Sequence, residues 1–173
     1  MKTLLTISAL LCGFQMPSVQ AASQTLKLDT EKSSVKWSGT FMKTPLTASL
    51  KFKSGELVLQ KHTIRSGTIT ADLKSISSDS GLDDQFKGEW LLNTEKYPTA
   101  VFKVKAFTEL HSITPDGPNA RVKGTLMFHG KTHEVEGDFV MTPDGNGFHA
   151  VGKFPTTYSK MVAGEASFDI FVK

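Results

Sequence analysis

An alternation of apolar and polar residues with period two recurs along almost the whole chain after residue 22, and it constrains the fold more than any other feature. Because successive side chains of a β-strand point to opposite faces, the alternation indicates strands with one dry and one solvated face. Turn signals such as "HGKTH", "PDGNG" and "PDGPN" separate most of the segments, and Ser54-Gly55 predicts a further turn. The apolar positions that share a face are Leu26 and Leu28; Val35 and Trp37; Leu46, Ala48, Leu50 and Phe52; Leu57 and Leu59; Ile69, Ala71 and Leu73; Ala100, Phe102 and Val104; Val122, Gly124, Leu126 and Phe128; Val135, Gly137, Phe139 and Met141; Phe148, Ala150, Gly152 and Phe154; and Ala166, Phe168, Ile170 and Val172.

Roughly eight to ten short antiparallel strands on this spacing predict an all-β barrel or sandwich. A barrel is favoured because Gly124, Gly137 and Gly152 each lie on the apolar face, where a missing side chain lets a strand coil sharply or leaves room inside. Most of the aromatic residues share these faces and are expected to point inward. A small eight-stranded barrel can either fill its interior with such side chains or hold one ligand, and the pattern leaves both possibilities open.

One stretch, "SDSGLDDQFKGEWLLN", breaks the alternation and predicts a short helix over residues 82–92. Leu82, Phe86 and Trp90 fall at helical spacing and form one apolar stripe. We expect this helix to close or gate one end of the barrel, with Phe86 and Trp90 packed over the mouth. Pro98 then favours an extended chain that enters the next strand.

The start of the predicted helix is acidic. Asp83 and Asp84 belong to its first turn, where negative charge suits the helix dipole, and Asp79 or Ser80 is expected to cap it. This arrangement explains the paired carboxylates more simply than general acid–base catalysis does.

Residues 1–21 have the three parts of a secretory signal: a basic start at Lys2, an apolar run, and the small-residue cleavage pattern Val19-Gln20-Ala21. The apolar run is shorter than the ~20 residues that a membrane-spanning helix needs, so we expect cleavage and no stable membrane insertion. The predicted mature domain is therefore a single unit over residues 22–173. The cysteine, Cys12, lies in the signal, which excludes disulfides and thiol chemistry from the mature domain.

The charge and the motifs exclude several classes of function. The formal net charge is +3, and +2 without Lys2, with lysines alternating along strands, so no nucleic-acid partner is expected. His129 and His133 are metal candidates by residue type, but no third ligand is near and a hairpin turn at Gly130-Lys131 is favoured, so neither a metal nor a cofactor is expected. "GKT" follows Gly124 at the wrong spacing for a phosphate-binding loop, and no G-x-S-x-G motif is present. We therefore expect no enzymatic activity.

The run "LLNTEKYPTAVFKV" resembles the most recognisable segment of the YceI-like family, a phrase of the type "dffdvekyPtatF" that leads from a short helix into a strand. The phrases "LDTEKSSVKWSGT", "GTITADLKSI" and "ARVKGTLMFHGKTHEVEGDF" extend the resemblance over nearly the whole mature chain, in the right order. It implies an antiparallel lipocalin-like β-barrel of about eight strands with one short helix near the mouth. It also implies a periplasmic location and binding of a long polyisoprenoid, such as an isoprenoid quinone or a polyprenyl phosphate, in an apolar interior.

The segments "KSISSDSGLDDQFKGEW" and "FMKTPLTA" depart from the best-studied members of that family, so the preference for a head group does not carry over. The predicted function is non-catalytic binding and carriage of this lipid, with a homodimer as a possible assembly. The alternative is a structural or stress-related periplasmic barrel with a filled core that binds a protein partner. Candidate polar residues at the mouth are Lys43, Tyr97 and Tyr158. The predicted ligand-binding interior consists of Trp37, Phe52, Leu73, Phe86, Trp90, Phe102, Phe128, Phe139, Phe154 and Phe168.

Overall fold

The structure, a computed structural model, describes residues 22–41, 43–60, 63–110, 117–159 and 162–173. Within these ranges the side chains of residues 41, 157–159, 162 and 163 are not described. The predicted signal, residues 1–21, lies outside the described part of the chain and stays a prediction.

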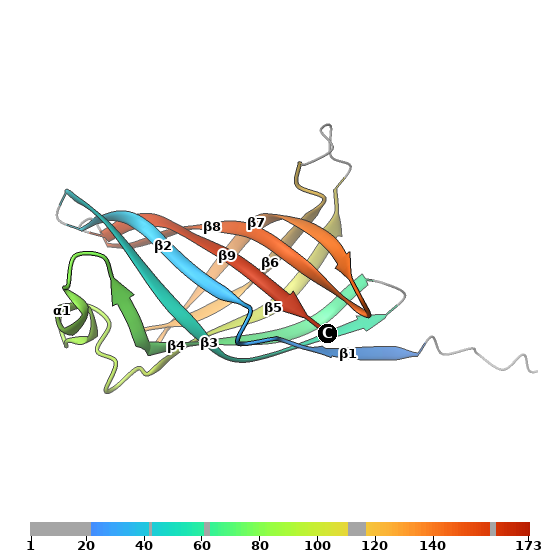
Figure 1. Cartoon of the computed structure of the whole chain (residues 1–173), viewed down its shortest axis with the longest axis horizontal. Helices are drawn as coiled ribbons and strands as arrows, with labels where there is room; N and C mark the ends of the chain where they lie inside the picture. The colour runs from blue at the N-terminus through green and yellow to red at the C-terminus, as the bar shows by residue number, and fades with distance from the viewer. Residues whose placement is uncertain (1–21, 42, 61–62, 111–116, 160–161) are drawn as a thin grey trace, which may run out of the picture.

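The described chain forms nine antiparallel strands and one short helix (Figure 1). The strands from β2 to β9 pair in sequence order, and β9 pairs back onto β2, so that eight of them close a barrel and confirm the predicted fold. In chain order the elements are β1 (Ser23–Lys27), β2 (Ser34–Phe41), β3 (Thr44–Gln60), β4 (Thr63–Ser78), α1 (Asp83–Lys87), β5 (Thr99–Glu109), β6 (Ala120–Phe128), β7 (Lys131–Asp144), β8 (Gly147–Ser159) and β9 (Val162–Val172).

The first strand, β1, shares one position of the barrel with β2. Strand β2 pairs with residues 44–51 of β3, and β1 pairs with residues 56–60 of the same strand. A bridge between Leu28 and Val172 attaches the other side of this segment to the end of β9. The two short strands therefore act together as one interrupted strand between β3 and β9.

The turn predicted at Ser54-Gly55 is not present, because β3 runs through this pair without reversing. The register between β3 and β4 shifts between Phe52 and Ser54, which marks an irregularity of the bulge type. Such a shift moves the apolar face from the even-numbered positions, where Phe52 is buried, to the odd-numbered ones, where Leu57 is buried. At the Ser-Gly pair, therefore, the set of residues that points into the barrel changes, while the strand continues in the same direction.

The turn between β6 and β7 lies one residue earlier than predicted. His129 and Gly130 form it, with φ values of 50° and 71°, whereas Lys131 already belongs to β7. Two successive positive φ values are typical of the tight hairpin turns that match the twist of the strands.

Phenyl rings of neighbouring strands occupy the space that the inward-facing glycines leave. A Cβ atom on Gly152 would lie 2.2 Å from the Phe139 ring, and one on Gly137 would lie 2.5 Å from the Phe154 ring. Gly124 receives the Phe102 ring in the same way, at 2.4 Å. The glycines therefore leave room for large rings next to the barrel wall.

Alternating charges cover the outer face of the barrel. The Arg121 guanidinium makes two hydrogen bonds to the Asp138 carboxylate, at 2.6 and 2.8 Å, and this hydrogen bonding holds the pKa of Asp138 below its ordinary value. Lys105 and Glu134 form another such pair across β5 and β7, with Nζ and Oε1 2.6 Å apart. The lysines of the strands thus lie on the solvated face, as their spacing predicts.

The predicted helix over residues 82–92 is shorter than expected, because α1 ends at Lys87. Gly88 adopts an extended conformation (φ −64°, ψ 166°), and the chain then folds back so that the N–H of Leu92 donates to the carbonyl of Phe86. No side chain caps the helix at Leu82, although the N–H of Leu82 donates to the Ser78 hydroxyl. Asp79 and Ser80, the predicted caps, do not serve this role.

Candidate functional site

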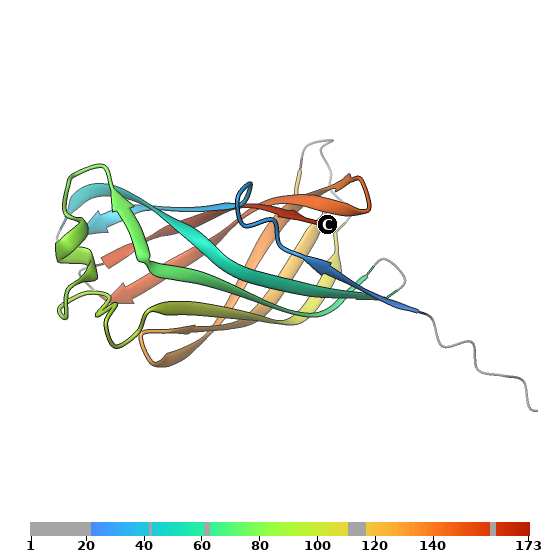
Figure 2. The same ribbon diagram turned by 60° about the horizontal axis from the view of Figure 1, so that its bottom comes forward.

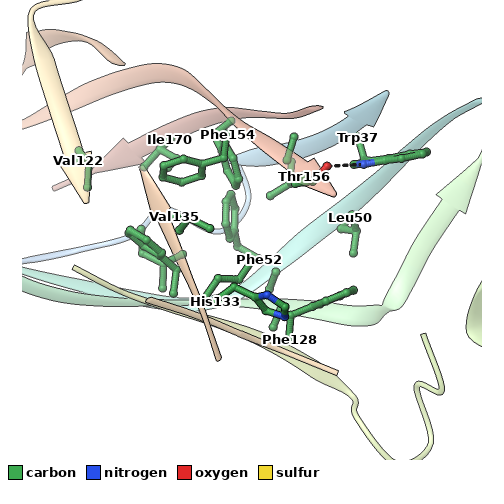
Figure 3. Close-up of a pocket in the computed structure, with 18 of the residues that line it drawn as sticks. Trp37, Leu50, Phe52, Val122, Phe128, His133, Val135, Phe154, Thr156 and Ile170 are labelled. Atoms are coloured by element: carbon green, nitrogen blue, oxygen red, sulfur yellow. Dashed lines mark hydrogen bonds between the residues drawn. The ribbon is translucent and has the colours of Figure 1, made fainter. Parts of the chain in front are cut away.

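An apolar cavity of about 490 Å³ lies inside the barrel (Figure 3). Side chains from all eight barrel strands line its wall, and residues of the connection between β4 and β5 line one end. In its wall the rings of Phe102, Phe139, Phe154 and Phe168 contact one another, with centroids 5.2 to 6.4 Å apart. The barrel is therefore not completely filled by its own core.

Nine of the ten residues that the sequence placed in the interior line this cavity. They are Trp37, Phe52, Leu73, Phe86, Phe102, Phe128, Phe139, Phe154 and Phe168. Their role in ligand binding stays a prediction. The tenth, Trp90, was placed wrongly: its side chain is 96% exposed. Because the helix ends before it, Trp90 leaves the helical stripe and turns to solvent, and Leu91 and Leu92 line the cavity in its place.

The connection from β4 to β5, residues 79–98, closes the barrel at the end where α1 lies (Figures 1 and 2). We call it the cap segment. Its underside consists of Phe86, which is buried, together with Leu82, Leu91 and Leu92, and it packs on Leu46, Ala48 and Ile76 of the barrel. Phe86, Leu91 and Leu92 also form part of the cavity wall.

The cap segment also completes a wall that strands alone leave incomplete. Strand β4 pairs with β5 only over Gly67–Asp72, and residues 73–78 continue beyond the start of β5. There the N–H of Leu73 donates to the carbonyl of Pro98 in the cap segment, at 2.9 Å. At this end, therefore, the side of the barrel between β4 and β5 is bounded by a loop and not by a strand ladder.

Two carboxylates attach the cap segment to the barrel. Asp83 accepts hydrogen bonds from the N–H and hydroxyl of Ser78, at 2.6 and 2.7 Å, and these bonds hold the pKa of Asp83 below its ordinary value. Asp79 accepts a 2.6 Å bond from the hydroxyl of Thr47 on β3, and this bond is the main reason why the pKa of Asp79 is lowered. Both attachments are therefore stronger when the carboxylates are ionised.

Two polar side chains face the apolar cavity from the barrel wall. The hydroxyl of Thr156 accepts a hydrogen bond from Nε1 of Trp37, at 2.8 Å. His133 lies on β7, and its side chain points into the cavity (Figure 3). Its Nε2 atom is buried and has no hydrogen-bond partner among the described residues. Glu134 also borders the cavity, but its carboxylate pairs with Lys105 on the outer face.

Two of the three polar residues predicted at the mouth, Lys43 and Tyr97, are not part of the cavity wall. Lys43 is exposed in the turn between β2 and β3, with φ at 70°. Tyr97 is half-buried outside the cavity wall, where its ring packs on His129 at a centroid distance of 4.6 Å. The side chain of Tyr158 lies outside the described part of the chain.

Comparison with known proteins places the barrel in a family. Residues 26–170 match the YceI-like domain, which is most of the chain. The chain belongs to the YceI-like family.

Solved structures show the same YceI-like fold at low sequence identity. One is the BcnA protein of Burkholderia cenocepacia, with 20% identity, a TM-score of 0.65, and coverage of 84% of this chain and 98% of that one. Another is a polyisoprenoid-binding domain from Saccharophagus degradans implicated in plant cell wall breakdown, with 13% identity, a TM-score of 0.57, and coverage of 86% and 97%. No curated protein sequence matches this chain significantly.

Two polar residues of this YceI-like barrel that face the cavity, His133 and Thr156, were not predicted from the sequence. Both continue an apolar alternation by one step: His133 precedes Val135 and Gly137, and Thr156 follows Gly152 and Phe154. The signal was therefore present in the period-two pattern. His133 was assigned to a hairpin tip because the turn was placed one residue too late.

The described residues contain no cluster of three or more His, Cys, Asp or Glu side chains that could hold a metal ion. Among the same residues, no helix has the length and hydropathy needed to cross a membrane.

Proposed function

We propose that this protein binds and carries an amphiphilic polyisoprenoid, an isoprenoid quinone or a polyprenyl phosphate, in the cavity of its barrel, in the periplasm and without a chemical step of its own. The observation that carries the proposal is the cavity of about 490 Å³ with its almost wholly apolar wall. This volume lies within the roughly 300–1,000 Å³ of small-molecule sites. The binding of a polyisoprenoid by the related domain from Saccharophagus degradans supports the same ligand class.

The driving force for such binding is the removal of a long hydrocarbon chain from water. Each CH₂ group that moves from water into an apolar site contributes about 0.8 kcal/mol. Phe, Leu, Val and Ile side chains line the cavity, so a prenyl chain inside it would lose few polar contacts and gain apolar ones. The cap segment would have to move, at least partly, for a chain to enter at the α1 end, because Phe86, Leu91 and Leu92 form the wall there.

The alternative function, a barrel with a filled core that binds a protein partner, requires an interior without a void. The cavity argues against that requirement. The charged pairs of the outer face, such as Arg121 with Asp138, satisfy one another and do not single out a docking surface for a partner.

The test is solvent extraction and mass spectrometry of the mature protein, purified from a periplasmic fraction without detergent. We expect a near-stoichiometric isoprenoid in the extract. The protein is then stripped and incubated with an isoprenoid quinone and with a polyprenyl phosphate, and the extraction is repeated. If both extracts are empty, lipid carriage is refuted and the filled-barrel alternative is favoured. Failure to recover the mature protein from the periplasmic fraction would refute the proposed location.

A further inference from the structure

His133 is an unusual component of an otherwise apolar interior. It lies near the start of β7, and its partner across the ladder, Leu126, also lines the cavity. The Nε2 atom is buried without a hydrogen-bond partner in the described part of the structure. Buried polar atoms in proteins are almost always paired, so a group of this kind calls for a specific explanation. The geometry allows one such explanation: the Nε2 atom pairs with an atom of a ligand inside the cavity.

The charges around the cavity restrict what that ligand atom can be. Among the described residues that line it there is no Lys or Arg, and the carboxylate of Glu134 pairs with Lys105 outside. An ionised phosphate would therefore enter a site without a cation to balance it, and burying an unpaired charge is strongly unfavourable. A neutral oxygen does not meet this obstacle.

The second polar group of the wall is consistent with a neutral ligand. The Thr156 hydroxyl accepts a hydrogen bond from Trp37 and keeps its own hydrogen available to donate. An imidazole nitrogen can donate to a carbonyl oxygen or accept from a hydroxyl, depending on the tautomer. Both groups thus suit an uncharged oxygen and neither supplies a fixed positive charge.

We infer that His133 is the specificity-determining contact of the cavity, and that it selects a prenyl lipid whose head is a neutral carbonyl or hydroxyl over one whose head is a phosphate. This inference rests on the proposed function and narrows its ligand class. His133 hydrogen-bonds the head-group oxygen, while the apolar wall surrounds the chain. A hydrocarbon of the same length makes the apolar contacts with the wall but not the hydrogen bond to His133.

The experiment compares geranylgeraniol, geranylgeranyl phosphate and the branched hydrocarbon phytane, whose carbon chains are matched. Binding is followed by the emission of Trp37, which lies in the cavity wall, in a Trp90→Phe background that removes the exposed tryptophan. We expect geranylgeranyl phosphate to bind at least about tenfold more weakly than geranylgeraniol. His133→Phe, which keeps a ring but removes the nitrogen, should weaken geranylgeraniol about tenfold and leave phytane within about twofold.

Two further variants separate a binding role from a structural one. His133→Leu repeats the test with another apolar side chain, and ligand-free protein with either substitution should be as stable as the parent or more so, because a buried unpaired nitrogen has been removed. His149→Phe is the control. It changes a histidine on the outer face, where Nε2 lies 2.6 Å from Asp169, and it should leave the affinities for geranylgeraniol and phytane unchanged.

The outcomes distinguish this inference from the function on which it rests. If the phosphate binds more tightly than the alcohol, or if the alcohol and phytane respond equally to both His133 variants, the role of His133 is wrong while lipid binding stands. If none of the three probes binds, the proposed function itself fails. Selective weakening of geranylgeraniol supports both.

Discussion

At the scale of single residues, the inward-facing glycines set the size of the cavity. Gly152 and Gly137 accept the rings of Phe139 and Phe154, which pack edge to face with their centroids 5.5 Å apart. A methyl group at Gly152 would have to push the Phe139 ring away from the wall, toward the centre of the barrel. Cavity volume and packing are therefore linked through positions that have no side chain.

Gly152→Ala should lower the free energy of unfolding by roughly 1–3 kcal/mol, the usual cost of overpacking. It should also reduce the capacity for ligand, because the displaced ring occupies cavity volume. Urea unfolding and ligand titration measure the two effects. Val151→Ala is the matched control, since Val151 is 46% exposed on the outer face of the same strand, and it should change stability by less than about 0.5 kcal/mol. A neutral Gly152→Ala would show that the ring does not need the glycine.

The period-two pattern predicted the residues that face inward, and its failures have local causes. Trp90 was misplaced because helical spacing was extended past Gly88, where the backbone leaves the helix. His133 was missed because the turn was placed one residue too late: positive φ at His129 is a property of backbone geometry that residue type indicates only weakly. Polarity alone also gives no sign that a histidine facing inward will lack a partner.

At the scale of elements, the sequence predicted where the cap segment lies but not the whole of the barrel wall that it forms. Its position at one end of the barrel follows from the helix inserted between two strands. That it also closes the side of the barrel beyond Asp72 depends on β4 being longer than its partner β5, which the alternation does not reveal. Similarly, the Ser54-Gly55 pair within β3 was interpreted as a turn, because a Ser-Gly pair is common both in turns and at irregularities within a strand.

Phe86→Ala should increase the rate at which a bound isoprenoid leaves the barrel, by about tenfold or more, because the buried ring forms part of the wall under the cap segment. Trp90→Ala changes an aromatic residue in the same segment that faces solvent, and it should leave that rate unchanged. Transfer of a short-chain isoprenoid quinone to phosphatidylcholine vesicles, followed by stopped flow, measures both. Equal rates in the two variants would show that the cap segment does not retain the ligand.

The attachments of the cap segment should weaken in acid. Hydrogen bonds from Ser78 and Thr47 lower the pKa values of Asp83 and Asp79, so the stabilisation that these carboxylates provide is complete above the ordinary carboxyl range near 4 and is lost as the pH falls through the lowered values. Ligand release should accelerate only below about pH 4. Asp83→Asn should release faster already at neutral pH and respond less to acid. Circular dichroism at each pH identifies any unfolding of the whole barrel, and pH-independent release from the intact barrel would contradict the role of the two carboxylates.

At the scale of the whole molecule, the closed barrel limits the length of chain that it can enclose. An apolar cavity of about 150 Å³ holds one benzene molecule, so a volume about three times as large has room for roughly three to four isoprene units. A longer lipid would have to leave part of its chain outside or push the cap segment aside. The volume, unlike the fold class, depends on how rings pack across strands and was not predictable from the alternation.

The affinity for prenols should therefore rise steeply with the first units, because about two buried CH₂ groups already correspond to a tenfold change in Kd. The gain should level off beyond roughly four units, when added carbons no longer fit. Displacement of a bound environment-sensitive dye by prenols of increasing length measures the series. A gain that continues undiminished to long chains would mean that the barrel expands on binding.

The two ends of the described chain lie at the end of the barrel opposite α1 (Figure 1). Ser23 of β1 pairs with Gln60, the last residue of β3, and Lys173 forms a 2.6 Å ion pair with Asp29 near the same end. An affinity tag or a surface linker fixed to either of these ends would therefore orient every molecule with its cap segment directed away from the support. Immobilised in this way, the protein would present a uniform layer of accessible barrels for sensing or depleting hydrophobic molecules from solution.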